Sequence, residues 1–173
     1  MPITPFHFGP GALVSALAPA WISWTVFVLA NCVIDLEPVS LFLLTGDPAH
    51  RFLHTAPGAT LVAAGCAIWG RPLCEWLLGW WNRQLSAAQA RWLAIGSRIS
   101  ARQAWGGALA GSWSHLLLDS FMHDDVQALW PLVSGNPLWR YMPLEVLHLG
   151  CAVAGVIGVS VMLIVRWRSL RRS

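Results

Sequence analysis

The chain has 173 residues, of which 56% are hydrophobic and only 11% are charged, and its mean hydropathy is +0.56. An ordinary soluble domain has an apolar share of roughly 45–50%. The 11 basic residues are all arginines and outnumber the eight acids, but they flank apolar segments instead of alternating with aromatics on one polar surface. These features argue against a soluble protein with a nucleic-acid partner and predict a single membrane-embedded helical domain over residues 1–173.

The N-terminal part consists of the motif MPITPFHFGPG and a long apolar run over residues 11–34, which Pro19 interrupts. A proline inside a helical pattern ends or kinks the helix. Two structures are possible for this run. One is a single kinked span. The other is a short helix over 9–17, a turn, and a second helix over 20–34 that runs back. Only the second brings His7 near Asp35, because one straight helix would separate them by about 40 Å at about 1.5 Å per residue.

Residues 35–56 are rich in proline and glycine, which predicts a segment that is mostly loop. Thr55 can cap a helix that begins near Pro57, and the first predicted span covers residues 57–70. This span is short for a hydrocarbon layer of about 30 Å and can extend past Arg71. Residues 82–103 carry four arginines and no acid, so we expect a cytoplasmic amphipathic helix on anionic headgroups.

Two further apolar runs predict spans over 104–122 and 144–165, and a basic tail follows over 166–173. With these three spans, nine arginines fall on one side of the membrane and only Arg51 and Arg140 fall on the other. By the positive-inside rule the arginine-rich side and the C-terminus are cytoplasmic, so the loops 35–56 and 122–143 face outward. The nine are Arg71, Arg83, Arg91, Arg98, Arg102, Arg166, Arg168, Arg171 and Arg172.

The stretch WSHLLLDSFMHDD, residues 113–125, places ionisable groups in an apolar helix. His115, Asp119 and His123 are spaced four residues apart and therefore line one helix face. A histidine and an aspartate one turn apart offer nitrogen and oxygen donors to a single cation. A charged aspartate near the bilayer centre costs at least about 2.5–3.5 kcal/mol, and no arginine is placed nearby to pair with it. This spacing predicts a metal site.

Other histidines and acids collect at the outward ends of the predicted spans. Polar groups that converge at one end of a bundle indicate a binding site. For a single histidine, ordinary hydrogen bonding or solvation is the competing interpretation. The aspartates Asp124 and Asp125 are interpreted as a solvated helix end. The collected residues are Asp35 and Glu37, His50 and His54, and Glu145 and His148.

Four motifs, in the order MPITPFHFGPG, NCVIDLEP, HRFLHTAPG and GSWSHLLLDSFMH, resemble those of small bacterial inner-membrane-associated proteins that are classed as metal-dependent hydrolases, including the LexA-regulated group. That family is distantly similar to zinc-dependent phospholipase C and to the zinc-dependent single-strand nucleases. The resemblance covers most of the chain. It implies an all-α, multi-helix membrane bundle in the bacterial inner membrane, with a polar metal-binding cluster at its periplasmic end.

The resemblance also implies a set of metal ligands for two or three Zn²⁺ ions. Asp119 would bridge metals, and His123 would fit a further one. Glu37, His50, Glu145 and His148 are weaker candidates; Glu145 precedes His148 here, whereas the distant relatives have a histidine followed by a glutamate. The implied ligands are His7, Asp35, His54, His115 and Asp119.

The expected activity is that of a membrane-bound hydrolase acting on a lipid-linked phosphoester. Zinc would lower the pKa of a bridging water towards ~7 and stabilise negative charge on a phosphoryl or carbonyl oxygen. Asp35 would orient the water or act as a base beside Asp119, and Arg51 or Arg140 could hold the phosphate. The alternative is a non-enzymatic membrane protein whose metal site is structural or serves metal handling.

Overall fold

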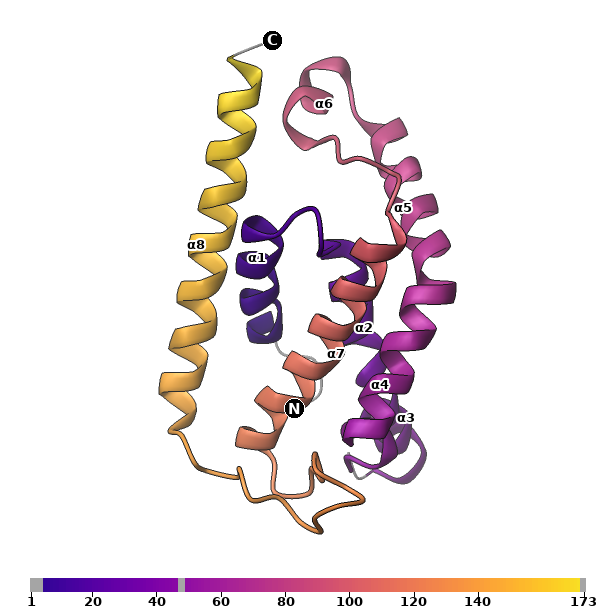
Figure 1. Ribbon diagram of the computed structural model, residues 1–173, viewed down its shortest axis with the longest axis vertical. Coiled ribbons are helices and arrows are strands. Elements are labelled where there is room, and N and C mark those ends of the chain that lie inside the picture. The colour runs from indigo at the N-terminus through magenta and orange to yellow at the C-terminus, as the bar shows by residue number, and fades with distance from the viewer. Residues whose placement is uncertain (1–4, 47–48, 172–173) are drawn as a thin grey trace.

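The computed structural model of the chain describes residues 5–46 and 49–171, and these residues form helices and connecting segments without a β-strand (Figure 1). The predicted all-α class is therefore confirmed for this part of the chain. Residues 1–4 of the first motif and Arg172 of the basic tail lie outside the described residues. The helices are α1 Phe8–Leu17, α2 Trp24–Ile34, α3 Leu36–Thr45, α4 Ala56–Gly65, α5 Arg71–Gln84, α6 Ala87–Leu93, α7 Ala101–Met122 and α8 Leu144–Leu170, with 3₁₀ turns at Pro5–His7 and Phe52–His54 and a π-helical segment at Cys66–Gly70.

The first apolar run folds back on itself, which is the second of the two predicted structures. α1 ends one residue before Ala18, and the chain turns through Pro19 into α2, which Ser23 caps. The side-chain amide of Gln103 on α7 donates to the Pro19 carbonyl at 2.8 Å, and the Gln103 carbonyl accepts from the Ser23 backbone at 3.0 Å. The reversal returns His7 to the end of the bundle at which α2 ends.

The segment after α2 differs from the predicted loop, because residues 36–45 form α3. Pro38 does not prevent this helix, since it lies in the first turn, where backbone N–H groups have no intrahelical partner. Gly46 ends the helix in the left-handed region, at a φ of 78°. The glycine and proline content therefore marked the two ends of a helix and not a continuous loop.

α4, the π-helical segment and α5 form one helical run, Ala56–Gln84, in place of the short 57–70 span. The predicted cap is present: the Thr55 hydroxyl accepts from the Gly58 backbone at 3.2 Å. Beyond this run the predicted amphipathic helix over residues 82–103 is broken into separate pieces. Within residues 82–103 the chain is helical at the end of α5, in the short α6 and at the start of α7, and residues 94–100 are not helical.

Three helical runs are long and apolar enough to cross a membrane, which fits the predicted membrane protein: Trp24–Thr45, Ala56–Gln84 and Leu144–Leu170. The predicted span 104–122 lies on α7, which is not among them. α7 is the central helix and packs between α2 and α4 (Figure 1). Its small and polar face is buried against these neighbours, and this face lowers its hydropathy.

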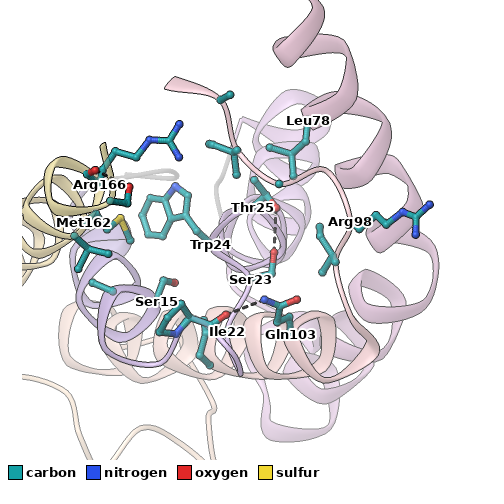
Figure 2. Close-up of a pocket in the computed structure, with 18 residues that line it drawn as sticks. Ser15, Ile22, Ser23, Trp24, Thr25, Leu78, Arg98, Gln103, Met162 and Arg166 are labelled. Carbon is teal, nitrogen blue, oxygen red and sulfur yellow. Dashed lines mark hydrogen bonds between the residues drawn. The ribbon is translucent and has the colours of Figure 1, made fainter. Parts of the chain in front are cut away.

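One end of the bundle holds α6, the C-terminal end of α8 and a pocket of about 550 Å³. Figure 2 shows Trp24 and Met162 lining this pocket, while Arg98 points away from it. The Arg166 guanidinium donates to the backbone carbonyls of Arg91 and Ala90. No histidine or acid is among the described residues that line this pocket. The predicted site residues lie instead at the opposite end, with α3, the start of α4 and the end of α7 (Figure 1).

Candidate metal centre

His115 and Asp119 lie one turn apart on α7 and face the same direction, as the spacing predicts. Both side chains are almost fully buried, and His115 Nε2 lies 3.2 Å from Asp119 Oδ2. α7 ends at Met122, and His123 has a non-helical backbone (φ −124°, ψ 130°). His123 therefore does not continue the helical row, and the loop after α7 determines where its side chain lies.

Two other segments bring donors to this pair. Asp35 lies at the junction of α2 and α3, and its Oδ1 is 3.2 Å from His115 Nε2. His54 ends the 3₁₀ turn before α4, and its Nε2 is 3.4 Å from Asp119 Oδ2. One donor atom from each of these four buried residues lies within 4.8 Å of the others. We call Asp35, His54, His115 and Asp119 the inner cluster.

The hydrogen bonding of the imidazole nitrogens in the inner cluster is compatible with a bound metal ion. The Nε2 atoms of His54 and His115 are buried and make no hydrogen bond within the described residues. The other nitrogen of each ring is held: His115 Nδ1 lies 3.2 Å from Asn31 Oδ1, and His54 Nδ1 lies 3.4 Å from Glu37 Oε2. Histidines that bind metals typically donate their second ring N–H to such an oxygen, which directs the other nitrogen towards the ion.

His7 reaches this site through the fold-back of the N-terminal run. Its Nε2 lies 3.0 Å from Asp119 Oδ1, and its ring stacks on that of His115 with centroids 4.3 Å apart. The two oxygens of Asp119 thus face different partners, because Oδ2 faces His54 and His115. A carboxylate with donors on both oxygens has the arrangement that a bridging ligand requires.

A second group of donors lies beside the first. One donor atom from each of His50, His123 and Asp125 lies within 4.8 Å of the others, and we call these residues the outer cluster. His50 Nδ1 lies 2.9 Å from Asp125 Oδ1, and the His50 backbone N–H donates to Asp125 Oδ2 at 2.8 Å. His50 Nε2 also lies 3.8 Å from Asp119 Oδ2, so Asp119 stands between the two clusters.

Carboxylates dominate the electrostatics of the two clusters. Burial alone would lower the pKa of His54, but its contacts with Asp119 and Glu37 raise this pKa above its usual value. Burial would raise the pKa of Asp125, but hydrogen bonds from the backbone and ring of His50 lower it. Within the described residues the ion pairs of Asp119 are all with histidines. A field that retains protons on imidazoles also attracts cations.

The weaker candidates divide into two groups. Glu37 accepts the backbone N–H groups of Arg51 and Leu53, besides contacting His54, so it positions the ligand segment. Glu145 is exposed at the start of α8, and His148 stacks on Phe6 at 4.2 Å. Neither Glu145 nor His148 belongs to the two donor clusters of the described chain.

The two arginines that the sequence offered for phosphate binding lie in different surroundings. Arg51 lines a pocket of about 290 Å³ together with His50, Phe52, Thr55, Gln127 and Trp130, which we call the polar pocket. Arg140 lies over the ring of Trp139, 4.6 Å from its centroid, and does not line this pocket. Of the two arginines, Arg51 therefore shares a pocket with a metal donor, His50.

Sequence reasoning missed two residues of this site. Asp125, interpreted as a solvated helix end, contacts His50 instead, because the loop after α7 turns back over the segment before α4. Asn31 was not considered, although it precedes Asp35 by one helical turn on α2 and shares its face. The spacing rule that found His115 and Asp119 would have found Asn31.

Comparisons of the chain with protein-family models, with curated proteins and with solved structures found no match. The resemblance carried by the four motifs therefore stays a prediction, and the function has to be argued from the donor clusters and the pockets beside them.

Proposed function

We propose that this chain is a membrane-bound, metal-dependent hydrolase that acts on a phosphoester. The observation that carries the proposal is the contrast between the two clusters. The inner cluster is closed, whereas the outer cluster has an acid, Asp125, whose side chain is 40% exposed, and a histidine, His50, that lines the polar pocket. Structural metal sites are closed, and catalytic ones keep a position open to substrate.

Zinc suits the donor set, since imidazole and carboxylate are its common ligands. One ion would be held by the inner cluster and one by the outer cluster, with Asp119 shared and His7 fixing its second oxygen. Zinc lowers the pKa of a bound water and stabilises negative charge on a phosphoryl oxygen. Arg51 would bind the phosphate oxygens in the polar pocket, since a guanidinium matches phosphate geometry.

Asp35 and Asp125 would have different tasks. Asp35 is buried behind the histidines, so it holds the inner ion and orients its ligands. Asp125 is the exposed carboxylate of the outer cluster and contacts His50, which lines the polar pocket, so it would hold the outer ion next to the substrate. His and Asp side chains gathered from several helices at one end of an all-α bundle also support the resemblance to zinc-dependent phospholipase C and the single-strand nucleases.

The proposed location is the bacterial inner membrane, with the site at the periplasmic boundary. Arg83, Arg91 and Arg98 belong to the end that holds α6 and the C-terminus, whereas Arg51 and Arg140 belong to the end that holds the clusters. This distribution supports a cytoplasmic C-terminus by the positive-inside rule.

The test is metal analysis of the purified protein together with phosphoester hydrolysis, for the wild type, His115→Ala and Asp119→Asn. We expect about two zinc ions per chain in the wild type, with loss of metal and of turnover in both variants. Glu145→Gln is the control, because Glu145 is an exposed acid outside both clusters. One tightly held metal without turnover would favour the structural or metal-handling alternative, and a metal-free wild type would overturn the proposal.

A further inference from the structure

A second, apolar groove adjoins the polar pocket at the same end of the bundle. It lies between α4, α7 and the loop after α7 and has a volume of about 710 Å³. Its walls are almost entirely apolar, with Leu116 and Leu117 from α7, Pro57 from α4 and Leu132 from the loop. This volume lies within the range of small-molecule sites, about 300–1,000 Å³. We call it the α4–α7 groove.

We propose that the α4–α7 groove binds the hydrocarbon chain of the substrate, so that the substrate is a single amphiphile with its phosphate in the polar pocket. The proposal rests on the proposed function for its phosphate end. The two spaces are adjacent, because Trp130 lines both of them. Thr55 lines the polar pocket, and the next residue, Ala56, lines the groove.

Two contacts join the segments that separate the polar pocket from the groove. The Ala56 backbone donates to the Ala128 carbonyl at 2.9 Å, which ties the loop to the start of α4. Phe52 meets Trp130 edge to face, with ring centroids 6.4 Å apart. An indole suits such a boundary, since one ring system offers an apolar face and a polar N–H. A phosphate on one side and a methylene chain on the other match the polarity of the two walls.

The surroundings of the groove indicate that the chain enters from a lipid phase. Leu132 at its rim is 90% exposed, and Leu117 and Leu129, which also line it, are 50% and 44% exposed. Apolar side chains this exposed and this close to a site mark contact with a membrane or a ligand. The pocket at the opposite end, by contrast, has no metal donor among its described lining residues.

The test uses hexadecyl phosphate that carries a photoreactive diazirine in its chain, with labelled peptides identified by mass spectrometry. We expect labelling within residues 113–117 and 128–132, and competition by unlabelled hexadecyl phosphate but much less by hexadecanol. Leu117→Trp should reduce labelling about tenfold, since it fills the groove. Leu61→Trp is the matched control: Leu61 is 60% exposed and Leu117 50%, but only Leu117 lines the groove.

Labelling needs no turnover, so the two proposals can fail separately. Groove labelling that hexadecyl phosphate displaces, without any zinc-dependent hydrolysis, would sink the proposed function and leave the groove assignment standing. Equal labelling of α8 and the groove, unchanged by Leu117→Trp, would overturn the groove assignment even if the protein is a hydrolase. In an active protein, Leu117→Trp should also lower kcat/KM for a hexadecyl phosphodiester and not for a butyl one.

Discussion

The direction of each imidazole in the inner cluster depends on the partner of its other ring nitrogen. Asn31 and Glu37 fill this position for His115 and His54. Asn31 has a further task, because its amide donates to the carbonyls of Phe27 and Gly111, at 3.0 and 3.3 Å. One side chain thus joins α2 to α7 and sets the tautomer of a ligand. Such partners commonly change metal affinity about 10–100-fold when removed.

Asn31→Leu should therefore weaken zinc binding by about 10–100-fold, measured by competition with a chelator of known affinity. Asn31→Asp retains an oxygen that accepts from His115 Nδ1, so it should bind zinc more tightly than Asn31→Leu. Asn82→Leu is the control: Asn82 also bonds backbone groups, those of Ile95, but at the opposite end of the bundle. Equal zinc affinity in the wild type and Asn31→Leu would contradict the role of Asn31.

Two neighbouring aspartates provide a sharper test of the outer cluster. Asp125 contacts His50 through both carboxylate oxygens, whereas Asp124 belongs to neither donor cluster of the described chain. Asp125→Asn should lower the zinc content by about one ion per chain, because the outer cluster loses its own carboxylate. Asp124→Asn should leave the zinc content unchanged. Equal loss in both variants would mean that net charge, and not coordination by Asp125, holds the metal.

Helix packing brings the donors of the inner cluster together. Gly107, Gly111, His115 and Asp119 follow one another at intervals of four on α7 and so lie on one face. A Cβ added at Gly111 would lie 2.6 Å from the Phe27 carbonyl oxygen, and one at Gly107 would lie 2.5 Å from that of Ser23. The same helix face therefore has glycines where α2 approaches closely and metal donors where α2 ends at Asp35. Small residues permit such close approach between helices in membranes.

Gly111→Ala should destabilise the protein by about 1–3 kcal/mol and lower its zinc affinity, because the backbone of α2 has to move away. Gly150→Ala on α8 is the matched control, since nothing lies within 4 Å of a Cβ added there. That substitution should be neutral or slightly stabilising, as expected for alanine in place of glycine in a helix. Thermal unfolding in detergent with and without a chelator measures both effects. Unchanged stability of Gly111→Ala would contradict the close packing.

Features whose residues lie on one helix, or directly at its end, were predictable from the sequence. The His115 and Asp119 pair and the Thr55 cap follow from local rules and are present. The reversal near Pro19 is one of the two structures that the sequence left open. The residues of the outer cluster were harder to assign, because a loop places Asp125 against His50 and loop geometry has no simple period. α3 was missed because Pro38 was taken as a breaker, although its position in the first turn is compatible with a helix.

At the scale of the whole molecule, the length of α7 relates the site to the membrane. Its 22 residues span about 33 Å at about 1.5 Å per residue, close to the hydrocarbon thickness of about 30 Å. Asp119 lies near one end of this helix, and Arg102 lies near the other. A central helix of this length thus separates the clusters, at one end of the bundle, from the arginine-rich segments at the other.

This arrangement predicts the topology, which two reporters can test. A fluorescent protein fused after Ser173 should be fluorescent, because the positive-inside rule assigns the arginine-rich end to the cytoplasm. Alkaline phosphatase inserted after Gly135, an exposed loop glycine with a φ of 80°, should be active, because that loop would lie in the periplasm with the clusters. Exchanging the two reporters should silence both and serves as the control. An active phosphatase after Ser173 would reverse the orientation, so that the clusters and the polar pocket would open towards the cytoplasm and any substrate would come from the cytoplasmic leaflet.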